Sequence, residues 1–156
     1  MKRFLLIILL ATSCQILKAQ SSTDPEHGFF FALIVEEMDT SINWYQDVLG
    51  FEIQNQQEIN EMGLKQANLK RGPVKLELIE LASAIDPDEF LTDENKGKRH
   101  IGIFKVGFTI PDFDKTINHI KESSAKLNGD VVTDPISGKK MVILLDPDGN
   151  RIQLFE

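Results

Sequence analysis

Three short apolar runs of the sequence carry polar side chains at alternate positions. Alternate residues of a β-strand point to the same side, so one face of each run is apolar and the other carries the polar groups. Such a mostly apolar surface with a few polar groups suits the recognition of a small molecule. The polar residues on these faces are Lys75, Glu77, Lys105, Thr109, Arg151 and Gln153.

The charges on these faces are three cations, Lys75, Lys105 and Arg151, against one carboxylate, Glu77. This balance favours a small, partly apolar ligand that carries a carboxylate or a phosphate. We also expect Glu77 to pair with Lys105. The alternative interpretation is that all of these side chains are solvated charges at strand edges, where they prevent pairing with other chains.

The N-terminus has the features of an export signal. Lys2 and Arg3 precede the apolar run Phe4–Ala11, which is too short to span a bilayer as a stable helix. Cleavage after Ala19 predicts a signal peptide over residues 1–19. In the alternative, a lipoprotein signal ends before Cys14, and a lipid on that cysteine is the one expected link to a membrane. Both alternatives predict a periplasmic or extracellular protein.

Removal of residues 1–19 from the 156 residues leaves 137, enough for one domain. The formal charge of −7 becomes −10, because Lys2, Arg3 and Lys18 are removed with no acidic residue. This acidic balance gives no support for a nucleic-acid partner. Cys14 is the single cysteine and lies in the leader, so a disulfide framework and cysteine catalysis are excluded.

The remaining sequence predicts the same order of elements twice, each time a strand, a helix and three strands. At an offset of 75 residues Asp39, Ile42 and Asn43 match Asp114, Ile117 and Asn118. The expected elements are strand 29–35, helix 39–49 and strands 51–57, 64–70 and 74–81, then strand 104–110, helix 112–127 and strands 130–133, 139–145 and 151–155.

Three segments carry a family resemblance. They are the strand Phe31–Val35 with the helix end Ser41–Phe51, the strand Val106–Asp112, and the turn Asp146–Asn150 with Gln153. Together they resemble the vicinal oxygen chelate superfamily, which contains glyoxalase, bleomycin-resistance and extradiol-dioxygenase proteins. Tyr45 in the helix and the turn before the last strand are interpreted as structural.

The resemblance implies an α+β fold of two tandem βαβββ modules, whose curved mixed sheets form a cleft that is often completed in a homodimer. The expected organisation is a tail (20–28) and a single glyoxalase-like domain (29–156), with modules 29–81 and 104–156 and a connector (82–103). Alternation along the first strand then places Phe30 on the cleft side.

Metal-dependent members of the superfamily carry a His on the first strand and a Glu on the last strand of each module. Here these positions hold Phe30, Glu77, Lys105 and Gln153. Phe has no donor atom and a protonated Lys repels a cation, so one carboxylate and one amide remain. We therefore expect no cofactor, and a divalent metal is the alternative.

The histidines do not replace the missing ligands. His27 and His100 stand at odd separations from the expected ligand positions, so a regular strand points them to the other face, and His119 falls in the second helix. They are interpreted as surface or packing residues.

Two main functions stay open. The first is an exported glyoxalase/bleomycin-resistance-like protein that binds a small molecule in a metal-free cleft. The second is a lyase, isomerase or dioxygenase that uses Glu77 as a general base, with or without a divalent metal, and Lys105 to stabilise an oxyanion. A lipid-anchored surface protein that binds a partner is a third.

Overall fold

The protein is described by a computed structural model, which covers residues 28–86, 89, 91, 92, 94, 95, 98, 101–123 and 125–156. The expected signal peptide, the tail up to His27 and parts of the connector lie outside these residues. Within the described part of the chain, no helix is long and apolar enough to cross a membrane.

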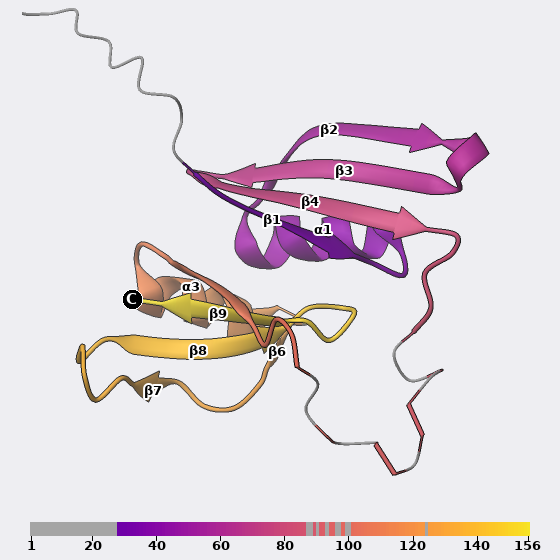
Figure 1. Cartoon of the computed structure of the whole chain (residues 1–156). Helices are drawn as coiled ribbons and strands as arrows, with labels where there is room; N and C mark the ends of the chain where they lie inside the picture. The colour runs from indigo at the N-terminus through magenta and orange to yellow at the C-terminus, as the bar shows by residue number, and fades with distance from the viewer. Residues whose placement is uncertain are drawn as a thin grey trace, which may run out of the picture.

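The first module is a four-stranded sheet with one helix (Figure 1). The strand order is β1-β4-β3-β2; β1 runs parallel to β4, and the other neighbours are antiparallel. A 3₁₀ turn at Asn60–Met62 joins β2 to β3. The elements are β1 (Phe29–Ile34), α1 (Met38–Leu49), β2 (Glu52–Ile59), β3 (Leu64–Arg71) and β4 (Val74–Leu81).

The second module repeats this plan with shorter strands. The order of its sheet is β5-β9-β8-β6, with β7 also paired to β8, and β5 runs parallel to β9 as β1 does to β4. The α+β fold with two βαβββ-like modules is confirmed. The elements are β5 (Val106–Thr109), α3 (Phe113–Glu122), β6 (Lys126–Leu127), β7 (Val132–Thr133), β8 (Lys140–Leu145) and β9 (Arg151–Phe155).

Helix α1 begins and ends at groups that satisfy its free backbone donors and acceptors. The Glu80 carboxylate at the end of β4 accepts from the backbone N–H of Met38 at 2.8 Å. Gly50 follows the helix with a left-handed φ of 66° and donates to the Gln46 carbonyl, as expected of a glycine after a helix. The sequence therefore places both ends of α1 correctly.

The second helix ends earlier than expected, at Glu122 instead of residue 127. The Ser123 hydroxyl donates to the Ile120 carbonyl and accepts from the Ala125 N–H, which competes with further helical hydrogen bonds. Lys126 and Leu127 then pair with β8 as strand β6. The expectation of a helix to residue 127 was wrong because strand pairing outweighs the local helical pattern.

One hydrophobic core joins the two modules. It contains inward-facing residues of both sheets and both helices. The rings of Phe51 and Phe108 meet edge to face across the modules, with centroids 6.0 Å apart. The Tyr45 hydroxyl of α1 donates to the buried Asp146 carboxylate in the turn before β9 at 2.9 Å. The structural interpretation of Tyr45 and of this turn is confirmed.

Candidate functional site

The outer face of the first sheet carries the residues that alternation predicts there. Leu76 and Leu78 are buried beneath the sheet, whereas Lys75 is exposed and Glu77 half-buried on the other side. Phe30, which lies across from Lys75 in the β1–β4 pairing, is 57% exposed. We call this side, away from the helix, the open face of the first sheet.

Glu77 on the open face is held by a chain of amide side chains. The Gln66 Nε2 on β3 donates to Glu77 Oε1, and the Gln57 Nε2 on β2 donates to Gln66 Oε1. Beside this chain, the Asn68 Nδ2 donates to Asn55 Oδ1 at 2.8 Å. The hydrogen bond from Gln66 holds one carboxylate oxygen of Glu77 and fixes the orientation of the carboxylate.

Sequence reasoning missed these amides, although their alternation on adjacent strands was a readable signal. Gln66 lies opposite Ile79 in the β3–β4 ladder, one diagonal step from Glu77, which is within reach of a long side chain. The expected ion pair between Glu77 and Lys105 is not formed within the described residues. Gln66 on the neighbouring strand β3 is the partner of Glu77 instead.

On the open face of the second sheet, Gln153 is buried. The residue is only 2% exposed, although Ile152 and Leu154 beside it point to the opposite side into the core. Its Nε2 lies 2.8 Å from the Met141 Sδ, and its Oε1 has no hydrogen-bond partner among the described residues. An unsatisfied buried acceptor costs about 1–3 kcal/mol, so a ligand donor would be stabilised at this oxygen, and rotation of the amide would offer its N–H groups to a ligand acceptor instead.

Gly107 lies directly beside Gln153 in the β5–β9 pairing. A Cβ added at Gly107 would stand 3.0 Å from the Gln153 carbonyl oxygen and 3.0 Å from the Phe155 ring. A side chain at this position would therefore press on the strand that carries Gln153. Glycine keeps the two strands close at the candidate site.

The other expected site residues are more exposed. Thr109 is exposed on β5, and Lys105 is exposed just before that strand begins. The Arg151 guanidinium is half-buried over the Phe104 ring, with its Cζ 5.1 Å from the ring centroid. Thus Phe30, Lys75 and Glu77 share one sheet, and Thr109, Arg151 and Gln153 share the other.

The described residues do not fit the metal set of the superfamily. They contain no group of three or more His, Cys, Asp or Glu side chains placed to hold a metal ion. His119 is on α3 and its Nε2 lies 2.8 Å from the Asp47 carbonyl oxygen of α1, while His27 and His100 lie outside the described residues. No catalytic step is therefore derived through a metal, and the metal-free state stays a prediction.

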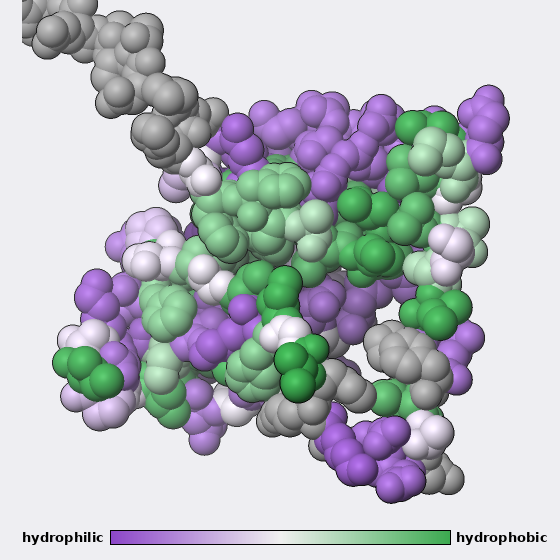
Figure 2. Space-filling view, in the orientation of Figure 1, coloured by the Kyte–Doolittle hydropathy of each residue, from purple (hydrophilic) through white to green (hydrophobic). Residues whose placement is uncertain are grey.

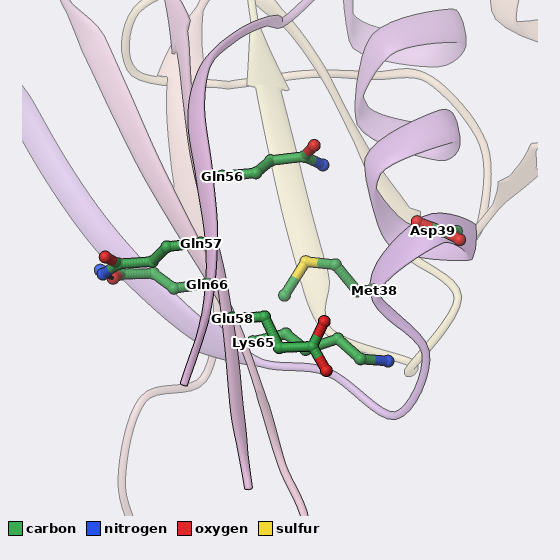
Figure 3. A pocket seen from close by; sticks show the side chains of 7 residues that line it. All are labelled: Met38, Asp39, Gln56, Gln57, Glu58, Lys65 and Gln66. Atoms are coloured by element: carbon green, nitrogen blue, oxygen red, sulfur yellow. Dashed lines mark hydrogen bonds between the residues drawn. The ribbon is translucent and has the colours of Figure 1, made fainter. Parts of the chain in front are cut away.

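Three hollows of the described surface are lined by none of the expected site residues. One of ≈ 290 Å³ lies between α1 and the edge of the first sheet, where Gln56 and Met38 point toward it (Figure 3). Gln57 on β2 and Gln66 on β3 extend to the opposite side of the sheet, away from Met38 (Figure 3). A cleft between the open faces is not shown in the single chain and stays a prediction.

The comparisons with known proteins agree with this geometry. The sequence is 29% identical over 126 residues to the uncharacterized protein YwkD of Bacillus subtilis, across 80% of this chain and 92% of YwkD. It is 30% identical over 125 residues to "Probable lactoylglutathione lyase, chloroplastic" of Arabidopsis thaliana; the match spans 78% of this chain but 33% of that longer protein.

Among solved structures, the glyoxalase family protein from Enterococcus faecalis has the same fold. Its TM-score is 0.67 at 23% identity, and the match covers 83% of this chain and 95% of that one. The profile of the Glyoxalase/Bleomycin resistance protein/Dioxygenase superfamily matches residues 29–154. The chain belongs to this superfamily, the vicinal oxygen chelate proteins.

Proposed function

We propose that this protein binds a small, partly apolar molecule with an anionic group on the open faces of its two sheets. It does so as an exported, metal-free homodimer. The observation that carries the proposal is the buried Gln153 carboxamide, whose oxygen has no partner. It stands where metal-dependent relatives are expected to carry a glutamate ligand.

The Gln153 amide is adaptable as a binding group. Rotation of the carboxamide exchanges its oxygen and nitrogen, so it can present an acceptor or a donor to the ligand. The N–H···S contact with Met141 opposes this rotation only weakly, because a thioether sulfur is a weak acceptor.

The positive charge at the site supports an anionic ligand. Lys105 is exposed beside β5, and Lys75 is exposed on β4. The Arg151 guanidinium rests on the Phe104 ring, which keeps it at the same open face. Charge-assisted hydrogen bonds from such groups to a carboxylate or phosphate are stronger than neutral ones.

The apolar part of the first open face supports a homodimer. Phe30 and Ile34, which share the open side of β1 by alternation, are each more than half exposed, at 57% and 56%. Figure 2 shows the apolar surface that lies over β1 and β4. A second copy that covered this surface would remove it from water and close the expected cleft. Export rests on the N-terminal leader alone.

Calorimetry with a matched pair of probes tests the anion requirement. Benzoate should bind at least about tenfold more tightly than benzamide, and Lys105→Ala should remove most of this difference, because one charged contact is worth about 1.5–3 kcal/mol. Lys126→Ala, which removes an exposed cation on β6, is the control. Equal affinities for the two probes, or no effect of Lys105→Ala, would contradict the proposal.

Elemental analysis tests the metal-free state. Protein purified without a chelator should contain no stoichiometric zinc, nickel, iron or manganese, because the expected ligand positions offer one carboxylate and one amide. One bound ion per chain would overturn this part of the proposal.

The second candidate function is that of a lyase. The Glu77 carboxylate, which the Gln66 amide holds in one orientation, favours this function. The Gln66 amide fixes one oxygen and orients the other as a general base. Incubation with methylglyoxal and glutathione, with formation of S-lactoylglutathione as the measured turnover, distinguishes the two functions. The binding proposal predicts no turnover, whereas turnover that Glu77→Gln abolishes would establish the lyase.

A further inference from the structure

A second polar hollow lies at the turn between β3 and β4. Its volume is ≈ 380 Å³, and none of its lining residues belongs to the expected ligand-binding set. It is formed where β2 begins and β3 ends. The lining residues are Gly50, Glu52, Gln54, Lys70, Arg71 and Gly72.

Arg71 in this hollow has no polar partner. No hydrogen bond or ion pair joins its guanidinium to any described residue, and its Nη1 is shut off from water. The guanidinium lies over the Phe108 ring, with 5.9 Å from Cζ to the ring centroid. Partial burial lowers the pKa of Arg71, which reflects the cost of holding this cation away from water.

The turn leaves room beside Arg71. Gly72 has a φ of 55° and stands at the first central position of a two-residue hairpin, where glycine is favoured. A Cβ built at Gly72 or at Gly50 would meet no atom within 4 Å. Both glycines therefore leave the rim of the hollow unobstructed.

We propose that this hollow is a second binding site, which takes a small oxyanion on the Arg71 guanidinium with Lys70 contributing positive charge. The planar guanidinium presents paired N–H donors that match two oxygens of one carboxylate or phosphate group.

Glu52 limits the charge of the ligand. It is an exposed lining residue and stands opposite Lys70 in the β2–β3 pairing. With Lys70 and Arg71 it leaves the site a net charge of about +1, which suits a single anionic group. Removal of the Glu52 charge should therefore strengthen binding.

Titration of the ¹⁵N-labelled protein with inorganic phosphate and, separately, with acetate tests the proposal at constant ionic strength, set with sodium chloride. We expect saturable shifts of the Gly50 and Gly72 amides and of the Arg71 Nε–H with at least one of the two anions. The anion that saturates identifies the phosphate or the carboxylate as the ligand group. Saturation with neither anion would overturn the site.

Three charge variants localise the binding. Arg71→Gln should weaken it by about tenfold or more, and Glu52→Gln should tighten it severalfold, since each changes one charge next to the anion. Lys126→Gln, outside the hollow, should leave it unchanged. If Arg71→Gln does not fold, Glu52→Gln decides the matter. Unchanged or weaker binding in Glu52→Gln, or full binding in Arg71→Gln, would contradict the proposal.

Discussion

At the scale of single residues, Tyr45 links the modules through one hydroxyl. The side chain is fully buried, and its O–H donates to Asp146 at 2.9 Å. Burial is the main cause that raises the pKa of Tyr45 far above its ordinary value, and the neighbouring Asp146 raises it further, so the hydroxyl stays a donor at any ordinary pH.

Tyr45→Phe should lower the free energy of unfolding by about 1–3 kcal/mol, because it removes a donor from a buried carboxylate. Urea unfolding measures this change. Ser41→Ala removes a longer hydrogen bond of 3.2 Å to the less buried Asp148 and should cost less. A larger loss in Ser41→Ala than in Tyr45→Phe would show that the Asp146 contact is not the main link.

The faces of the site residues could be predicted from the sequence, but their partners could not. Period-2 alternation placed Lys75 and Glu77 on the open face because it depends on one strand only. That Gln66 holds Glu77 depends on the register of two strands. The burial of Gln153 depends on side chains of neighbouring strands, which no local pattern encodes.

At the scale of elements, the β5–β9 pairing requires a small residue at Gly107. Gly107→Ala should lower the free energy of unfolding by about 1–3 kcal/mol, because the new methyl group presses on β9. Thr109→Ala, on the exposed side of the same strand, is the matched control and should cost less. Equal losses of unfolding free energy in the two variants, measured by thermal or urea unfolding, would mean that β5 and β9 accommodate a methyl group at Gly107 without strain.

The junction of β4 with α1 should make stability depend on pH. The ion pair with Lys65, 2.6 Å long, and the hydrogen bond from Met38 lower the pKa of Glu80 below its ordinary 4.5. The ionised form is therefore the one that folding favours. Its stabilising contribution is present above pH 4.5 and is lost as the pH falls through the lowered pKa.

Glu80→Gln tests this dependence by urea unfolding across the acidic range. The wild type should exceed the variant in stability near neutral pH, and the difference should shrink as the solution is acidified. Glu61→Gln, on the exposed 3₁₀ turn, should show little difference at any pH. If the stability difference between the wild type and Glu80→Gln grew as the pH fell, the ionised Glu80 would not be the form that stabilises the fold.

At the scale of the molecule, the shared core predicts one cooperative unit. Residues of both modules form a single buried cluster, and Phe51 meets Phe108 between them. Hydrogen exchange of the core amides in β4 and β9 should therefore report the same free energy of opening. Much faster exchange in β9 would show that the second module opens alone.

The repeat and the family could also be predicted from the sequence, because element order and turn residues are local signals. The end of α3 and the extra strand β6 could not, since they follow from pairing with β8. In the proposed homodimer, the relation between the two open faces would depend on how the two copies pack, which no local sequence pattern encodes. It is the part of the account on which the proposed function depends most.

The most direct test of the account is the Gln153 side-chain amide resonance, followed by NMR as benzoate is added. The account predicts a saturable shift of this resonance, because the Gln153 Nε2–H would donate to the benzoate carboxylate in exchange for its weak contact with the Met141 sulfur. Lys126→Ala should leave the shift intact, and Lys105→Ala should weaken it. If benzoate saturates the protein while the Gln153 resonance stays unmoved, the ligand does not bind at the open faces and the central claim is wrong.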